Sequence, residues 1–427
     1  MPAAAVLIGA FLVLAIAGVP IAFCLAIASL VTTWYMGFPA VVVAQRIATG
    51  LQSFPLIAIP LFVLAGSIMA KGGVARRIVD FAYIIVGPFR GGLAMVNCIQ
   101  SMLFGGVSGS AIADISSTGP IMIPMMRQKG YDNEFSTALT VASATQGIII
   151  PPSHNMIIYA MAAGGVSVGR LFLAGYIPGF LIGFALMITS YIIAVRRGYP
   201  RETRPPWREC VRISVDGLLA VFAAVIIVGG IAFGVFTATE ASAIAVFYAA
   251  FLGIFVYREL KWRHIWPILV DSVRTISTVL FLIASASAFA WLLTRLRVPA
   301  AVMSAMLSAT DNPIVLLLII NVVLIVLGML MDVAPLIVIV TPILVPVVTA
   351  VGMSPVTFGI VLLLNLGIGL TTPPVGTGLF VGCAVGHTTV EKTTRAMIAF
   401  WPAMIAVLLL TTFIPALTTF LPALIMD

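Results

Sequence analysis

The sequence predicts an all-α protein that crosses a membrane many times. Of its 427 residues, 62% are hydrophobic and only 8% are charged, whereas soluble proteins carry about 25% charged residues. This composition excludes a soluble enzyme and a disordered chain. Apolar runs such as residues 3–31 and 213–236 exceed the roughly 18 residues that a spanning helix needs. They lack the alternation of apolar and polar residues that is typical of β-barrels.

The charged residues and the cysteines exclude further kinds of function. The net charge of +8 comes from basic residues in short loops between apolar runs, where they act as topology signals and do not indicate binding of nucleic acid. The four cysteines are scattered without a CxxC pair, so they indicate neither a disulfide framework nor a metal site. The first apolar run lacks a basic leader and a cleavage site, and we expect it to remain as a helix.

The first half contains full spans and helices that are too short to span. Residues 3–36 predict one long helix, or two short ones broken at Gly18–Pro20. Residues 92–105, and the helix that follows up to residue 127, are each too short for a ~30 Å hydrocarbon core. They predict a re-entrant hairpin at 92–127, interrupted at 105–110. The other predicted elements are a span at 49–69, half-helices at 135–146 and 154–163 around a break at 147–153, and a span at 171–195.

The second half repeats this pattern after a connecting region at residues 196–265. That region holds the longest polar loop, residues 196–212, and predicted spans at 213–236 and 238–257. The elements predicted after it are a span at 266–293, a hairpin at 313–351 interrupted at 328–332, half-helices at 356–366 and 375–385 around a break at 367–374, and a span at 396–426.

An internal repeat accounts for the similarity of the halves. Seven helix-breaking residues recur 222 positions later in one register, which indicates a structural repeat of fixed period. The pairs are Pro120/Pro342, Pro124/Pro346, Gly130/Gly352, Gly147/Gly369, Pro151/Pro373, Pro152/Pro374 and Gly164/Gly386. We predict a single membrane domain over residues 1–427, with repeat cores at 49–195 and 266–427 joined by residues 196–265.

The charges predict opposite orientations for the two repeats. Arg90, Arg127 and Lys129 bracket the first hairpin and place its base on the cytoplasmic side. Counting spans from there places the base of the second hairpin, which carries no basic residue, outside. Paired hairpins and paired broken helices in inverted halves are typical of secondary transporters whose site lies near the midplane.

Two groups of oxygen atoms are candidate cation sites. The first combines the tip at residues 108–110 with the break at 147–152, and the second combines the tip at 328–332 with the break at 367–374. Hydroxyls and unwound carbonyls are hard donors that suit Na⁺, and a proline leaves a preceding carbonyl without its helical donor. The alternative is close packing of helices through small residues.

Ionisable residues at membrane depth are further candidates. Asp332 is a functional candidate by default, with a structural ion pair or a helix cap as the alternative. Arg295 could bind a substrate carboxylate or anchor to lipid headgroups. Asp114 and Glu240 are predicted to cap helices, and His154 is either a proton relay or an ordinary hydrogen-bonded histidine. No nucleophile–base pair or cluster of metal ligands occurs in the sequence, so we do not expect an enzyme.

Several segments carry a family resemblance over nearly the whole chain. They are residues 54–66, 105–114, 147–153, 233–241 and 365–376. Together they resemble the large membrane subunit of TRAP transporters, in the ion transporter superfamily. The resemblance implies a bacterial inner-membrane protein that works with two separate polypeptides, a small four-helix membrane subunit and a periplasmic binding protein. It also implies import of an organic acid, such as a C4-dicarboxylate or sialic acid, driven by Na⁺ through an elevator movement.

The resemblance also implies roles for particular residues. Na⁺ is the expected coupling ion, and no organic cofactor is expected. The expected Na⁺ ligands are Ser108, Ser110, Gly147, Gly328, Thr371 and Thr372. The expected substrate region comprises Ser153, Arg295 and Asp332. The alternatives are a self-sufficient ion-coupled carboxylate symporter and, with weaker support, a channel or an intramembrane enzyme.

Overall fold

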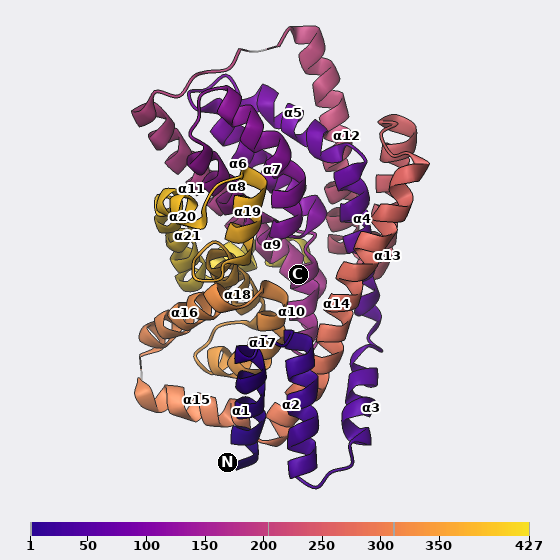
Figure 1. Cartoon of the computed structure of the whole chain (residues 1–427), viewed down its shortest axis with the longest axis vertical. Helices are drawn as coiled ribbons and strands as arrows, with labels where there is room; N and C mark the ends of the chain where they lie inside the picture. The colour runs from indigo at the N-terminus through magenta and orange to yellow at the C-terminus, as the bar shows by residue number, and fades with distance from the viewer. Residues whose placement is uncertain (1, 204, 311, 427) are drawn as a thin grey trace.

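The computed structural model describes residues 2–203, 205–310 and 312–426, and every regular element in these ranges is a helix (Figure 1). Six of the described helices are long and apolar enough to cross a membrane. The number rises to eight if each of two bent helix pairs counts as one span. The predicted all-α polytopic class is therefore confirmed.

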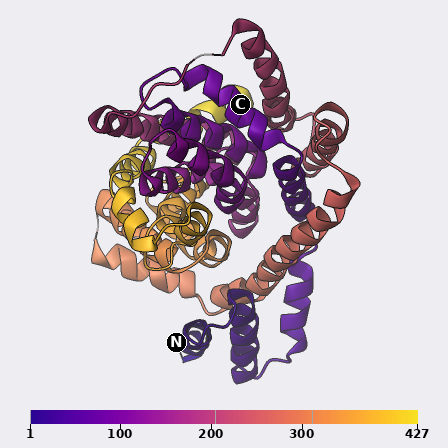
Figure 2. The same cartoon turned by 45° about the horizontal axis from the view of Figure 1, so that its top comes forward.

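One group consists of the long helix α14 and of helices that pack on it or on one another. The group comprises α1 (Pro2–Ile16), α2 (Ile21–Tyr35), α3 (Val41–Gly50), η1 (Phe54–Ile57), α4 (Ala58–Lys71), α5 (Val74–Val86), α12 (Trp207–Ala232), α13 (Ala238–Phe251), the π-helical η2 (Leu252–Val256) and α14 (Trp262–Arg295). Helix α14 packs against α2, α3 and α4 and runs as a long diagonal in Figures 1 and 2. The first apolar stretch forms two helices, because Gly18 adopts a left-handed conformation (φ +79°) between them.

The remaining helices form a compact body from both halves of the chain. From the first half come α6 (Gly92–Ser108), α7 (Ala111–Gln128), α8 (Asn133–Ala144), α9 (Gln146–Ile149), α10 (His154–Ala162) and α11 (Val168–Arg197). From the second come α15 (Val298–Ala309), α16 (Pro313–Leu330), α17 (Val333–Ala350), α18 (Pro355–Leu370), α19 (Thr377–Gly386), α20 (Val390–Met397), α21 (Trp401–Phe413) and α22 (Ala416–Met426). The halves interlock, because α10 packs on α17 while α19 packs on α7 and α8.

The two hairpins and the two broken helices occupy corresponding places. Pairs α6–α7 and α16–α17 form the hairpins, and the second helix of each pair contains both repeated prolines. The peptide bonds Pro151–Pro152 and Pro373–Pro374 are both cis. These features agree with the 222-residue register, whereas the boundaries of the two repeat cores remain a prediction.

Several predicted boundaries are wrong by a few residues. The breaks at 105–110 and 328–332 are shorter than predicted, because α6 continues through Ser108 and α16 through Leu330. Gly147 likewise lies inside α9, and α18 continues through Gly369 to Leu370. These glycines had been interpreted as helix breakers, but they are helical positions where two backbones meet.

Three further corrections concern the connecting and terminal segments. Helix α12 begins at Trp207, inside the predicted polar loop. The base of the second hairpin includes a helix, α15, where none was predicted. The last predicted span is divided into α21 and α22, and α20 meets α21 at a 55° bend. Pro415 directly precedes α22, and a proline has no N–H with which to continue the preceding helix.

Close glycine contacts join each hairpin to the broken helix of its own half. A Cβ atom added at Gly105 would lie 2.6 Å from the Cα of Gly147, and one added at Gly369 would lie 2.6 Å from the Cα of Gly328. In each case the obstructing atoms belong to backbone, which cannot rotate away. The glycines therefore let two helices approach to backbone contact beside each hairpin tip.

We expect Gly105→Ala and Gly369→Ala to destabilise the protein by about 1–3 kcal/mol, the usual cost of overpacking a core. Gly229→Ala is the matched control, because a Cβ there meets no atom within 4 Å and the residue has no positive φ. Thermal unfolding of the detergent-solubilised variants measures the effect. Equal melting temperatures for all three variants would show that the close contacts do not matter.

Candidate substrate and cation sites

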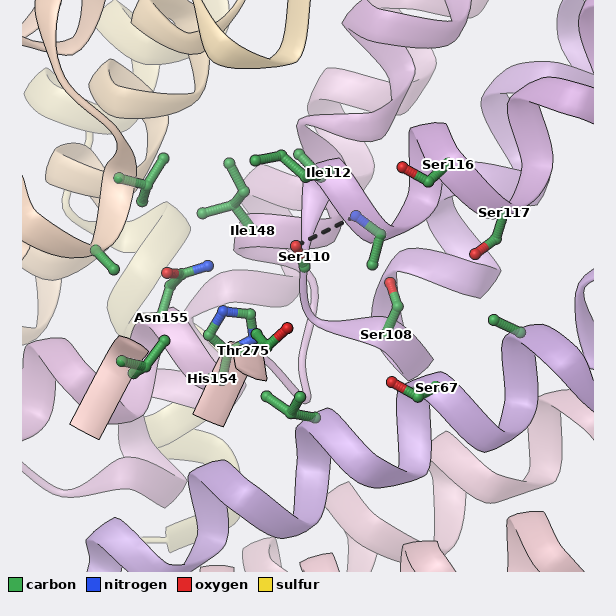
Figure 3. A pocket seen from close by; sticks show the side chains of 18 of the residues that line it. Ser67, Ser108, Ser110, Ile112, Ser116, Ser117, Ile148, His154, Asn155 and Thr275 are labelled. Atoms are coloured by element: carbon green, nitrogen blue, oxygen red, sulfur yellow. Dashed lines mark hydrogen bonds between the residues drawn. The ribbon is translucent and has the colours of Figure 1, made fainter. Parts of the chain in front are cut away.

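A cavity of about 390 Å³ lies between the two hairpin tips and helices α4 and α14. Ser108 and Ser110 of the first tip, Asp332 of the second tip, and His154 and Asn155 of α10 all line it. Figure 3 shows both serines, His154 and Asn155 around this space, with Ser67 opposite Ser108. The structure thus brings together polar groups from both repeats at one place.

The first tip docks onto the break between α9 and α10. Gly109 makes the turn in a left-handed conformation (φ +65°), and a Cβ there would lie 3.1 Å from the Cα of Ser153. The Asn155 side chain donates a hydrogen bond to the Gly109 carbonyl at 3.4 Å. The Ser110 hydroxyl accepts from the Ala113 amide at 3.4 Å and caps α7. Ser110, rather than the predicted Asp114, is therefore the cap of this helix.

Oxygen atoms with unused hydrogen-bonding capacity surround the first tip. The hydroxyls of Ser108 and Ser153 are buried and have no hydrogen-bond partner. Pro151 has no N–H, so the Gly147 carbonyl four residues earlier cannot make its usual helical bond. Buried polar groups normally have partners, and this set is therefore suited to a desolvated cation.

The second tip presents a carboxylate where the first presents a hydroxyl. Asp332 lies 222 residues after Ser110, and its Oδ1 accepts from the Val333 amide at 2.8 Å, at the start of α17. The Thr377 hydroxyl donates to the same oxygen at 3.4 Å. Asp332 is thus a helix cap, the alternative role considered for it, and it also lines the cavity.

Threonine hydroxyls and carbonyls converge behind the second tip. The hydroxyls of Thr371 and Thr372 both donate to the Ile368 carbonyl, at 2.8 and 2.7 Å. The Trp401 indole donates to the Thr371 hydroxyl at 3.2 Å. Gly328 lies directly against Gly369, whose carbonyl accepts from the Thr372 amide at 2.9 Å, because Pro373 has no N–H to donate. The predicted residues of the second cation site are therefore close together, although both hydroxyls are engaged within their own helix.

The structure does not bring Arg295 to the cavity. Of the residues of α14 that line it, Val279 is nearest in sequence to Arg295, and 16 residues of helix span about 24 Å at 1.5 Å per residue. Arg295 is exposed, and its guanidinium lies 5.9 Å from the ring centre of Phe38. Nearby, Arg46 lies 5.2 Å from the Trp291 ring. A cluster of arginines and aromatic rings is typical of the membrane–water interface.

We expect Arg295→Ala and Arg295→Lys to keep uptake within about twofold of the wild type, because a substitution on an exposed surface usually has a small effect. Uptake is measured at a substrate concentration below saturation, in membranes with equal amounts of permease. A loss of tenfold or more in both variants would return Arg295 to the substrate site.

Sequence reasoning missed the Lys71–Asp271 pair at the cavity wall. The Lys71 ammonium lies 2.8 Å from an oxygen of Asp271, although the two residues are 200 positions apart. Lys71 is the only lysine or arginine among the described residues that line the cavity. In the sequence Lys71 directly follows a predicted span, where a basic residue is typically a topology signal. The sequence contains one signal for this pair. Asp271 is an acidic residue inside α14, a helix that the sequence predicts to span the membrane.

One family model and several known proteins match nearly the whole chain. The family model "Tripartite ATP-independent periplasmic transporter, DctM component" matches residues 8–417. The chain is 43% identical to the uncharacterized protein YgiK of Salmonella typhimurium, over 96% of this chain and 95% of that protein. It is 39% identical to the sialic acid TRAP transporter large permease protein SiaM of Vibrio cholerae, over 93% of each.

A solved structure with a similar fold is that of the YdaH transporter of Alcanivorax borkumensis. It matches with a TM-score of 0.61 and covers 89% of this chain and 87% of its own. Sequence identity is 13%, so the likeness concerns the fold alone.

Proposed function

This chain belongs to the DctM family, the large permease subunits of tripartite ATP-independent periplasmic transporters. We propose that it imports an organic acid and that a Na⁺ gradient drives this import. It is a multi-pass membrane protein and a transporter subunit rather than an enzyme. The observation that carries the proposal is the single cavity that joins both hairpin tips to Lys71.

The cavity offers one positive group to an organic anion, Lys71, beside the carboxylates of Asp271 and Asp332. Relatives are named for the transport of sialic acid, C4-dicarboxylates, isethionate and 2,3-diketo-L-gulonate, all of which are acids. A bare carboxylate at membrane depth is costly unless a positive group pairs with it. Lys71 supplies that group, the Asp332 carboxylate can accept hydrogen bonds from hydroxyl or amide groups of the substrate, and the Asn155 amide can accept or donate them. Ser153, which was also predicted to be in the substrate region, is buried beside Gly109 of the first tip and is not among the described residues that line the cavity.

Na⁺ is the proposed coupling ion. In the first half, Ser108, Ser110 and the Gly147 carbonyl would bind one ion, since they combine the unpartnered Ser108 hydroxyl with a second hydroxyl and a carbonyl freed by proline. In the second half, the residues that would bind a second ion are Gly328, Thr371 and Thr372. Because both groups lie at or behind hairpin tips that face the cavity, ion binding would stabilise the tips in the form that holds substrate. An elevator movement of the body that carries both tips would then transfer the site across the membrane.

Two partner proteins complete the proposed system in the bacterial inner membrane. The isethionate permease DctMQ of Oleidesulfovibrio alaskensis is matched over 96% of this chain but only 65% of its own length. That relative therefore has a further region outside the match, and we propose that a separate small membrane subunit takes the place of that region in the system of this chain. A periplasmic binding protein would deliver the substrate, and membrane lipid would surround the complex.

Reconstitution tests this assignment against a self-sufficient symporter. Proteoliposomes are prepared with the permease alone, with the small subunit, and with the small subunit plus substrate-loaded binding protein. We expect uptake only with all three components. Uptake by the permease alone would identify it as a self-sufficient carboxylate symporter.

A further inference from the structure

A buried polar cluster without an assigned role lies in the first half, between α6 and α7. Asp114 of α7 is its centre, and this side chain has no solvent-exposed surface. Gln100 and Ser101 of α6, and Thr118 of α7, are equally buried. Their hydrogen bonds connect them in a chain that ends on the carboxylate.

The connections within the cluster are short. The Thr118 hydroxyl lies 3.0 Å from Asp114 Oδ1, and the Gln100 amide donates to the Thr118 hydroxyl at 3.2 Å and to the Ser101 hydroxyl at 2.7 Å. The same amide lies 3.3 Å from the side-chain oxygen of Asn97. Two oxygens have no hydrogen-bond partner, namely Asp114 Oδ2 and Gln100 Oε1.

The cluster lacks a positive charge to balance the carboxylate. None of the ion pairs found among the described residues includes Asp114. Burying an unpaired carboxylate is far more costly than burying a neutral group, and unmatched buried polar oxygens add to that cost. Asp114 is therefore either neutral, with a proton, or paired with a cation that the described side chains do not supply.

We propose that Asp114, Gln100, Ser101 and Thr118 bind a monovalent cation, Na⁺, in addition to the two sites at the hairpin tips. All four side chains provide oxygen ligands, the kind preferred by hard cations. Ala113 and Ser116, which flank Asp114 in α7, line the cavity, so the cavity lies beside the turn of α7 that carries Asp114. The proposal rests on the proposed function in one respect: the choice of Na⁺ as the cation follows from the proposed Na⁺ coupling.

The cluster belongs to one half of the chain only. The positions 222 residues after Gln100, Ser101, Asp114 and Thr118 are Val322, Val323, Leu336 and Val340. All four are apolar, so the second hairpin has no equivalent. The internal repeat therefore predicts two ion sites of one kind, whereas this third site is an addition to the first repeat.

The test measures the thermal stability of the purified permease in NaCl and, as the condition without Na⁺, in choline chloride. Asp114→Asn preserves shape and removes the charge, so without Na⁺ it should be at least as stable as the wild type. As Na⁺ rises, the wild type should gain stability, whereas the variant should need at least about tenfold more Na⁺ for half of that gain. Asp80→Asn, which neutralises an exposed acid of α5, is the matched control and should follow the wild type.

Thr118→Val provides a second variant in case Asp114→Asn is not recovered from membranes. It removes one oxygen ligand, keeps the charge, and should also shift the Na⁺ response. If Na⁺ stabilises the wild type and both variants equally, Asp114 holds a proton and the proposed site is wrong, while the tip sites stand. If Na⁺ has no effect on the wild type, both this site and the proposed Na⁺ coupling are wrong.

Discussion

Lys71→Met is expected to lower substrate uptake by about ten- to a hundredfold at a substrate concentration below saturation. A hydrogen bond to a charged group contributes roughly 1.5–3 kcal/mol, and every 1.4 kcal/mol is a factor of about ten in affinity. Lys71 is the only fixed positive charge among the described residues of the cavity wall, so nothing nearby could replace it. Lys71→Arg should keep partial activity, because the charge is preserved.

Substitution of Asp271 tests whether Lys71 binds substrate or only forms a structural ion pair. Asp271 holds Lys71 at 2.8 Å, and both side chains are about half exposed, so the pair itself contributes little stability. If Lys71 binds substrate, Asp271→Asn should keep transport while Lys71→Met loses it. Equal losses in both variants would make the pair structural. Lys392→Met is the control, since Lys392 is exposed on α20 and does not line the cavity.

Ser110→Gly and Thr372→Ala are each expected to raise the Na⁺ concentration for half-maximal uptake about fivefold, because each removes one oxygen ligand worth about 1 kcal/mol. Glycine is chosen at position 110 because it costs a helix cap only a few tenths of a kcal/mol, whereas alanine costs about 1 kcal/mol. The measurement is initial uptake as a function of external Na⁺ at fixed substrate and binding protein.

A matched threonine controls for the loss of a hydroxyl bond within a helix. Thr349 donates to the carbonyl four residues earlier at 2.7 Å, as Thr372 does, but Thr349 is exposed. Thr349→Ala should therefore leave the Na⁺ dependence unchanged. A normal Na⁺ dependence in both Ser110→Gly and Thr372→Ala would return these residues to a role in helix packing.

The sequence predicted the places of the hairpins and broken helices because prolines and glycines recur in one register. It placed their boundaries less well, because glycine has two uses that composition does not distinguish. Gly105 and Gly328 permit backbone contact within helices, whereas Gly109 makes a turn with a positive φ. Only the packed structure shows which use applies.

The sites were predictable where they depend on local sequence, and not where they depend on distant contacts. Ser108, Ser110 and Asp332 were found from the tips themselves. Lys71 was missed because its partner Asp271 lies on another helix 200 residues away. Arg295 was grouped with the substrate region because its position before the second hairpin suggested proximity, but α14 carries it away from the cavity.

The central claim is that a Na⁺ gradient drives organic-acid uptake through this permease. Proteoliposomes containing the permease and small subunit, supplied with loaded binding protein, are given either an inward Na⁺ gradient or a proton gradient of equal size. We predict accumulation above equilibrium with the Na⁺ gradient only, and a Hill coefficient for Na⁺ above one. Accumulation that persists without Na⁺ but disappears when the proton gradient is collapsed would contradict the account.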